Sequence, residues 1–390
     1  MNKIETLIKE LCPNGVEWKE LGNICTVKTG KGINKNFIQA NPGEFPVVNS
    51  GKDPLGFVNI FNTVDDPIGI TSRGAGVGYV SWNEGNYFRG NLNYSATIKD
   101  KSKLSARFLY FYLKNNSVEI EKLCTFNGIP ALNKENLEKL TIPIPPLEIQ
   151  EEIVKILDKF TDYVTELTTE LTLRQKQYNY YRDKLLSFEN EVQIKKLSEL
   201  ATIKARIGWQ GLTKKEYLKT GKYYLVTGTD FIKGTVNFST CHFVEEERYL
   251  QDINIQLKNE DVLVTKDGTL GKVAYITNLP GPTTLNSGVF VVRKNSDEIL
   301  SRYLYHYLNS PYLMKFAQSR LTGGTIKHLN QNVIVDFPIP IPDLEKQKEI
   351  IYILDSFNSI VNSLEKGLPK EIELRQKQYE YYRDKLLTFD

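Results

Sequence analysis

The segment "LRQKQYNYYRDKLLSFE" at 173–189 recurs as "LRQKQYEYYRDKLLTFD" at 374–390, with changes at three of 17 positions. The changes are mild ones: Asn179/Glu380, Ser187/Thr388 and Glu189/Asp390. Upstream of these copies, "IPIPPLEIQEEIVKILDKF" at 142–160 matches "IPIPDLEKQKEIIYILDSF" at 339–357. A period of about 200 residues is too long for a solenoid repeat, so the pattern indicates a duplicated domain with a duplicated tail.

Both tails have the periodicity of long helices. Apolar residues and tyrosines recur at steps of three and four, which is the narrow stripe of a coiled coil. The first stripe consists of Ile149, Ile153, Ile156, Phe160, Val164, Leu167, Leu171, Tyr178, Tyr181, Leu185 and Phe188. A helix of 40 residues is about 60 Å long and would expose this stripe if it stood alone. We therefore predict that the two helices pair, and antiparallel pairing is favoured because a globular segment precedes each of them.

The segments between the tails predict a mixed α/β (α+β) fold. Short β-branched runs such as "DPIGITS" (66–72) and "EDVLVTK" (260–266) alternate with Gly, Asn and Pro clusters, as strands joined by prominent loops require. Helices are expected at 105–114 and 301–309. The predicted organisation is a globular domain at 1–145, a helix at 146–189, a second globular domain at 190–342 and a second helix at 343–390.

The second helix is four residues longer than the first. Ile142 and Arg174 are 32 positions apart, whereas Ile339 and Arg375 are 36 positions apart. The additional residues lie near "EKGLPKEIE", where glycine and proline favour a helix stop and restart. We predict a break at 367–369.

Several classes of protein are disfavoured by what the sequence lacks. It has no run of about 18 apolar residues, which a membrane span requires. Its first residues "MNKIETLIKELCPNG" interrupt their apolar positions with charges, unlike a signal peptide, so a cytoplasmic location without membrane partners is expected. The four cysteines show no CxxC spacing and the three histidines are scattered, so no metal site is predicted.

Catalytic and cofactor motifs are also missing. The string "GTLGKV" at 268–273 is too short for a phosphate loop, and the glycines of "RGAGVG" at 73–78 have the wrong spacing for a dinucleotide fingerprint. The string "NSPY" at 309–312 lacks the second proline of the adenine-methyltransferase tetrad and follows a helical pattern, so helix termination explains it better. We predict a non-catalytic binding protein without a cofactor.

The charge distribution favours nucleic acid as the ligand. The net charge is +3, and the basic excess falls in the globular segments while the tails are acidic. Lysine and arginine can bind guanine or phosphate, and asparagine can bind adenine. Any one of these residues could simply be solvated, but their recurrence in loops of both halves supports the set. The candidates are Lys28, Lys31, Lys35, Arg73, Arg89, Asn91 and Asn93 in the first half, and Lys204, Arg206, Lys266, Lys272, Asn286, Arg320, Lys327 and His328 in the second.

The whole layout resembles the specificity subunit of type I restriction–modification systems. The resemblance is carried by "CPNGVEWKELG" (12–22), by the two "IPIP" junctions, and by "GLPKEIELRQKQYEYYRDKLL" (367–387) with its earlier copy. It implies two target recognition domains, each reading one half of a split double-stranded DNA sequence. It also implies an antiparallel coiled coil with pseudo-two-fold symmetry that sets the spacer.

The same resemblance implies the partners. Two modification subunits would carry the S-adenosylmethionine and the adenine-methylating site, and restriction subunits with an ATP-driven motor and nuclease would join through the complex. The residues expected to bind the modification subunits are Arg174, Tyr178, Tyr181, Arg182, Arg375, Tyr379, Tyr382 and Arg383. The alternatives are a coiled-coil scaffold, a stand-alone DNA-binding protein without restriction partners, or a stand-alone modifying enzyme, which would need a cofactor motif.

Overall fold

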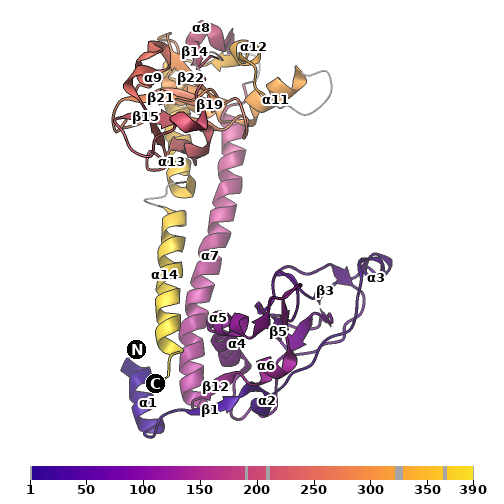
Figure 1. Cartoon of the computed structure of the whole chain (residues 1–390). Helices are drawn as coiled ribbons and strands as arrows, with labels where there is room; N and C mark the ends of the chain where they lie inside the picture. The colour runs from indigo at the N-terminus through magenta and orange to yellow at the C-terminus, as the bar shows by residue number, and fades with distance from the viewer. Residues whose placement is uncertain (1, 189–191, 208–210, 321–327, 363–366, 390) are drawn as a thin grey trace. The chain divides into compact units, whose positions relative to one another are not determined.

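The computed structural model describes residues 2–188, 192–207, 211–320, 328–362 and 367–389 (Figure 1). The chain forms two compact units. The first unit comprises Met1–Glu166 together with Glu373–Asp390, and the second unit comprises Leu167–Ile372. The boundaries that the sequence predicts for the domains stay a prediction.

The first unit contains a mixed α+β domain. Its elements are α1 (Asn2–Leu11), β1 (Glu17–Glu20), α2 (Leu21–Ile24), β2 (Cys25–Thr26), α3 (Lys35–Ala40), β3 (Phe45–Val48), β4 (Phe57–Val58), β5 (Ile68–Thr71), β6 (Val80–Trp82), β7 (Phe88–Arg89), β8 (Asn93–Ser95), β9 (Thr97–Ile98), α4 (Ala106–Asn115), α5 (Ser117–Lys122), β10 (Cys124–Thr125), β11 (Ala131–Leu132), α6 (Lys134–Glu138), β12 (Thr141–Ile144) and the first part of α7 (Leu147–Leu185). Strands β6, β5 and β8 form an antiparallel sheet, and β3 pairs with β4 and β7. The core gathers buried side chains of this sheet, of α4 and of the long helices.

The second unit repeats this plan. Its elements are β13 (Gln193–Lys196), α8 (Leu197–Leu200), β14 (Ala201–Ala205), η2 (Lys214–Glu216), β15 (Tyr223–Val226), η3 (Gly228–Asp230), β16 (Phe231–Ile232), β17 (Thr235–Val236), β18 (His242–Val244), α9 (Glu246–Leu250), η4 (Ile253–Ile255), β19 (Val262–Thr265), β20 (Val273–Tyr275), β21 (Thr283–Leu285), β22 (Val289–Lys294), α10 (Ser301–Leu308), α11 (Pro311–Ser319), α12 (Gln331–Val335), β23 (Pro338–Ile341), α13 (Leu344–Asn362) and α14 (Leu368–Leu386), whose end belongs to the first unit. Its sheets run β14-β22-β19-β20 and β18-β15-β21.

Strand pairing identifies the equivalent elements of the two units. The parallel pair β3–β7 aligns Val48 with Arg89, and the parallel pair β15–β21 aligns Val226 with Leu285. The "IPIP" stretches form β12 and β23, which pair antiparallel with β1 and β13. Proline cannot donate a ladder hydrogen bond, so these stretches suit two-stranded ribbons, where one edge of the strand has no neighbour.

A buried glutamine ties each long helix to the globular part of its unit. The side-chain amide of Gln150 donates to the carbonyl oxygens of Lys103 and Pro145, at 2.8 and 2.7 Å, and its oxygen accepts from the amide of Ser105 at 2.8 Å. In the second unit, Gln347 makes the same three contacts with Glu298, Pro342 and Leu300. Both glutamines are fully buried.

The helices run antiparallel within each unit, as the sequence predicts. In the first unit the C-terminal end of α14 lies beside the first turns of α7 (Figure 1), and the rings of Phe160 and Tyr382 stack with centroids 5.3 Å apart. In the second unit the equivalent pair, Tyr181 and Phe357, stacks at 5.4 Å. The tail of one repeat therefore packs against the start of the other, and the predicted fold class is confirmed.

The C-terminal helical region is divided in two, at the place where the glycine and proline lie. Helix α13 ends at Asn362 and α14 begins at Leu368. Gly367 has a φ of +106°, a left-handed conformation that favours glycine. A Cβ at this position would approach the carbonyl oxygen of Ser359 to 2.7 Å.

Candidate nucleic-acid interface

Three loops of the first unit meet beyond the end of β5. Hydrogen bonds between backbone groups join them: the amide of Ser72 donates to Leu92, the amide of Leu132 donates to Ser72, and the amide of Gly74 donates to Pro130, each at 2.9 Å. The carbonyl and amide of Ser72 thus bridge two neighbouring segments. These hydrogen bonds fix the position of Ser72, and the turn that follows it begins with the exposed Arg73.

The second unit has the same backbone frame beyond the end of β19. The amide of Lys266 donates to Gly288 and the amide of Leu329 donates to Lys266, each at 2.9 Å. The amide of Thr265 closes the turn by donating to Lys272. The loop is one residue shorter than in the first unit, where the amide of Thr71 donates to Tyr79. The two units therefore share a backbone frame that carries different side chains.

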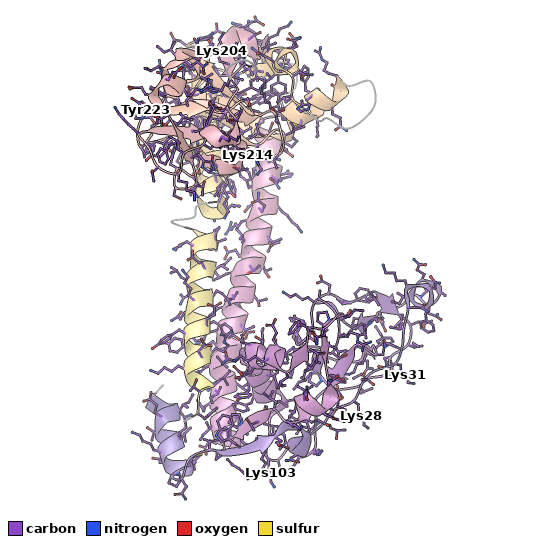
Figure 2. All side chains as sticks on the ribbon, viewed as in Figure 1. Lys28, Lys31, Lys103, Lys204, Lys214 and Tyr223 are labelled. Carbon is purple, nitrogen blue, oxygen red and sulfur yellow. The ribbon has the colours of Figure 1, made fainter. Side chains whose placement is uncertain are left out.

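The exposed candidates of the first unit lie along this frame. Lys28 and Lys31 flank a segment that pairs with residues 90–94, and they line a pocket of about 320 Å³ that also includes Asn62 and Asp66. In Figure 2 both lysines lie on the same side of the unit. Arg73 occupies the turn after β5 and Asn91 the loop before β8, and both side chains are exposed. The loops of this unit therefore expose cations and an amide, the residue types that contact phosphates and bases.

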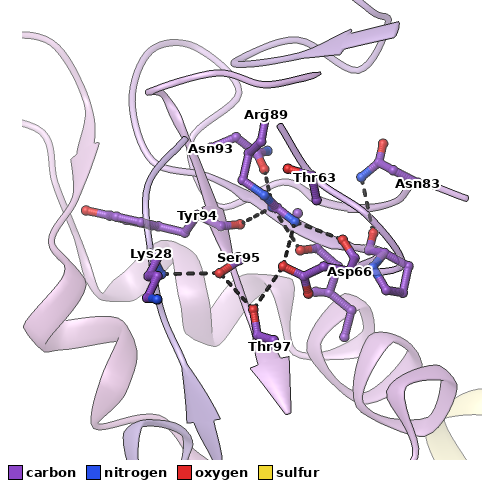
Figure 3. A network of polar contacts seen from close by, with 12 residues as sticks. Lys28, Thr63, Asp66, Asn83, Arg89, Asn93, Tyr94, Ser95 and Thr97 are labelled. Carbon is purple, nitrogen blue, oxygen red and sulfur yellow. Dashed lines mark hydrogen bonds and ion pairs between the residues drawn. The ribbon is translucent and has the colours of Figure 1, made fainter. Parts of the chain in front are cut away.

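Arg89 does not belong to that exposed set, contrary to the sequence prediction. Its side chain is buried, and its guanidinium donates to the carbonyl oxygens of Ile68, Tyr94 and Asp66, and to the carboxylate of Asp66 at 3.2 Å (Figure 3). Burial lowers the pKa of Arg89, and the nearby Tyr87 and Asp66 oppose that shift. With its donors directed inward, Arg89 holds the loops together and is not placed to contact a base.

Two more predicted residues are buried. Asn93 accepts a hydrogen bond from Arg89 at 2.7 Å and is 1% exposed. Arg206 in the second unit donates to Leu285 at 2.8 Å and to Gln251 at 3.0 Å, and is also 1% exposed. We assign all three buried side chains to positioning the loops, because a base edge cannot reach them in this structure.

The remaining candidates are distributed over several elements. Lys266, Lys272, Asn286 and His328 surround the turn after β19. Lys204 is exposed on β14, Arg320 follows α11, and Lys35 starts α3, which packs on a separate small cluster of buried residues. Lys327 lies outside the described residues. The structure therefore brings together four of the second-unit residues and leaves Lys35, Lys204 and Arg320 apart from the central frames.

The residues expected to bind partners have two different environments. Tyr178 and Tyr379 are buried in the unit cores, while Tyr181 and Tyr382 stack on the phenylalanines of the facing helix. Arg182 and Arg383 each lie over the ring of the buried tyrosine four positions earlier, at 5.7 Å, and pair with the next aspartate. Arg174 pairs with Glu170, and Arg375 donates to Gln378. The tyrosines among them mainly stabilise the helix pairs.

The most exposed apolar residues of the repeat are not among the predicted ones. Leu173 and Tyr180 are 59% and 62% exposed, and their copies Leu374 and Tyr381 are 54% and 60% exposed. A spacing of seven residues places each leucine and tyrosine on the same face of its helix. The signal was present in the sequence as a leucine and a tyrosine seven positions apart in both copies, outside the predicted stripe.

Other kinds of site find no support in the described parts of the chain. Among those residues, no group of three or more His, Cys, Asp or Glu side chains is arranged to hold a metal ion. None of the helices found there combines the length and the apolar character needed to cross a membrane.

Comparison with known proteins identifies the relatives of the chain. Residues 13–174 and 189–374 both match the family described as "type I restriction modification DNA specificity domain". The specificity subunit of the type I restriction enzyme EcoR124I/EcoR124II from Escherichia coli is 35% identical over 304 residues, covering 75% of this chain and 73% of that protein. A putative type I specificity subunit from Haemophilus influenzae is 34% identical, covering 80% of this chain and 78% of that protein.

Solved structures agree on the fold. The crystal structure of a type I restriction–modification S subunit from M. genitalium has a TM-score of 0.64 at 21% identity, and the match covers 96% of this chain and 97% of that one. A chain from a structure concerned with complex assembly of a type I restriction–modification system has a TM-score of 0.59 at 15% identity, covering 96% of this chain and 98% of that one.

Proposed function

Because this chain belongs to the family of type I restriction–modification DNA specificity subunits, we propose that it reads a bipartite, asymmetric DNA target with a fixed spacer and recruits modification and restriction subunits to it. The observation that carries this proposal is the duplicated loop frame, built from the same backbone hydrogen bonds in both units. Two such frames provide two reading surfaces.

The difference between the frames supports an asymmetric target. At one equivalent position of the parallel strand pairs, the first unit has Arg89 and the second has Leu285. Each incorrect base pair costs only about 1–3 kcal/mol, so one domain reading a few pairs discriminates weakly. Two domains that read different half-sites add their specificities, and a fixed spacer adds a geometric filter.

The long helices would provide the spacer and the docking surfaces. Buried tyrosines and stacked aromatic pairs hold each helix to its partner, which stiffens the pair. The exposed apolar pairs, Leu173 with Tyr180 and Leu374 with Tyr381, occur once in each repeat. Tyrosine is enriched in protein interfaces, so two equivalent surfaces fit two copies of a modification subunit.

Catalysis would belong to the partners. The chain itself would act without a cofactor, the modification subunits would methylate adenine, and the restriction subunits would join through the complex. A second possibility, a coiled-coil scaffold or a DNA-binding protein without restriction partners, lacks a specific observation in its favour.

The test is a selection from a random duplex library with the complex reconstituted from this chain and its modification subunit. The proposal expects two short conserved blocks of different sequence, separated by an unconserved spacer of constant length. Equal recovery of all duplexes would support the scaffold. Binding of S-adenosylmethionine by the isolated chain, measured by equilibrium dialysis, would support a modifying enzyme.

A further inference from the structure

We propose that Arg73 and Asp267 occupy the same reading position in the two units, where Arg73 selects guanine and Asp267, supported by His328, selects cytosine. This inference rests on the proposed DNA-binding function and adds the residues and the base class to it. It predicts that the two half-sites differ at this base pair because the side chains carry opposite charges.

The hydrogen-bonded frame makes the two positions equivalent. The buried threonines Thr71 and Thr265 end β5 and β19, and the next residue in each unit is held by two backbone hydrogen bonds of 2.9 Å. Arg73 and Asp267 come immediately after that residue. Arg73 and Asp267 are therefore the first residues of their turns, and each follows a residue that hydrogen bonds hold to two neighbouring segments.

The following residue shows that the turn faces open space in both units. Gly74 has a φ of +96° and Gly268 a φ of +74°. A Cβ built on either glycine would meet nothing within 4 Å. Each turn therefore presents its backbone and the preceding side chain outward, as close approach to a duplex requires.

Arg73 has the chemistry of a guanine reader. Its side chain is exposed, and no hydrogen bond or ion pair of its guanidinium is found within the described residues. Arg73 forms an isolated antiparallel β-bridge with Ala131. The side chain of Ala131 is a single methyl group, too small to cover the guanidinium. A guanidinium presents a fixed fork of donors, which matches the O6 and N7 acceptors of guanine in the major groove.

Asp267 has the opposite preference. Its carboxylate contacts Nδ1 of His328, and both side chains remain partly exposed, at 41% and 68%. His328 directly precedes Leu329, just as Ala131 precedes Leu132, so the histidine stands where the first unit has alanine. A carboxylate only accepts hydrogen bonds, so it suits the N4 amino group of cytosine. It would repel the O6 and N7 acceptors of guanine, and the N7 acceptor beside the amino group of adenine.

The test compares variants of the complete complex of this chain with its modification subunit by selection from a random duplex library. Arg73→Ala should lose the guanine preference at one position of one half-site, by about 5- to 150-fold, whereas Arg73→Lys should keep part of that preference, because lysine can also donate to guanine O6 and N7. Asp267→Ala should lose the cytosine preference at one position of the other half-site by a similar factor. Asp267→Asn should shift that preference to adenine, which an amide side chain can bind through N6 and N7. Lys122→Ala, a change at an exposed side chain of α5 paired with Glu119, is the control and should leave both half-sites unchanged.

Other outcomes would overturn the inference. If Arg73→Ala weakens all duplexes equally while Arg73→Lys restores affinity, Arg73 contacts a phosphate and reads no base. If the Asp267 variants leave the second half-site unchanged, or alter both half-sites, the assignment of Asp267 is wrong. In these cases the complex without substitutions still selects a split sequence, and the proposed function stands. If the complex without substitutions selects no sequence, the proposed function itself fails.

Discussion

Replacing Gln150 with leucine should destabilise the first unit strongly. The change removes two hydrogen bonds that join the first turn of α7 to the loop before α4, and a third to Pro145, just before α7. Leucine fills a similar volume but leaves the carbonyl oxygens of Lys103 and Pro145 and the amide of Ser105 without this buried partner. Each such group costs about 1–3 kcal/mol, so for three groups we expect a loss of at least about 3 kcal/mol in the free energy of unfolding.

The assay is urea unfolding of the full chain, followed by tryptophan fluorescence and by circular dichroism. Trp82 reports on the right region, because the guanidinium of Arg107 lies 4.6 Å from its ring and pairs with Asp158 of α7. Since the chain has two compact units, each is expected to unfold in its own transition, and the transition of the first unit should move to a lower urea concentration. The matched control is Gln376→Leu, which changes an exposed glutamine of α14 bonded only to the side chain of Glu380 in the described contacts. If Gln150→Leu lowers the free energy of unfolding by less than about 1 kcal/mol, its effect is close to that of an ordinary surface substitution. That result would refute the role of this glutamine.

Three further predictions concern assembly, pH and spacing. The double change Tyr180→Ser with Tyr381→Ser should weaken binding of the modification subunit in gel filtration. The control Tyr352→Ser changes a tyrosine of α13 that is 75% exposed and lies outside the copies at 173–189 and 374–390, and it should not weaken binding; equal elution of both variants would contradict this. Burial lowers the pKa of His306, against the opposing effect of Asp355, so the stability it contributes above pH 6.5 is lost as the pH falls. His306→Phe should therefore reduce the drop in melting temperature between pH 7.5 and 5.5, and an unchanged drop would be evidence against it. Deleting the four residues Lys370–Glu373 of α14 removes about 6 Å of helix, close to two base-pair rises. Methylation mapping should then show a shorter spacer, and an unchanged spacer would contradict the role of the helices in setting it.

The sequence was sufficient for the architecture because the repeat constrains it. The stripe that includes Phe160 and Tyr181 predicts which faces of the helices meet, and the structure shows those residues stacked on Tyr382 and Phe357. The strand-like runs at 66–72 and 260–266 correspond to β5 and β19. These features depend on periodicity along one element, which a sequence shows directly.

The site could be predicted only in part. Arg89, Asn93 and Arg206 have the residue types of nucleic-acid contacts, yet they are buried, because neighbouring carbonyl oxygens satisfy them. Composition does not show whether a loop cation faces solvent or the chain itself. An aspartate in a loop carries no signal of DNA binding in the sequence, and the equivalence of Asp267 with Arg73 is visible only in the hydrogen bonds of the frames.

The central claim, that two different loop surfaces read two halves of one target, is tested most directly by mapping adenine methylation across the genome of a host with the complete system. The account predicts methylated sites with two unlike conserved blocks and a spacer of constant length. It also predicts that exchanging residues 33–105 for those of a relative with another target changes one block alone. A single continuous block, or changes in both blocks after that exchange, would contradict the account.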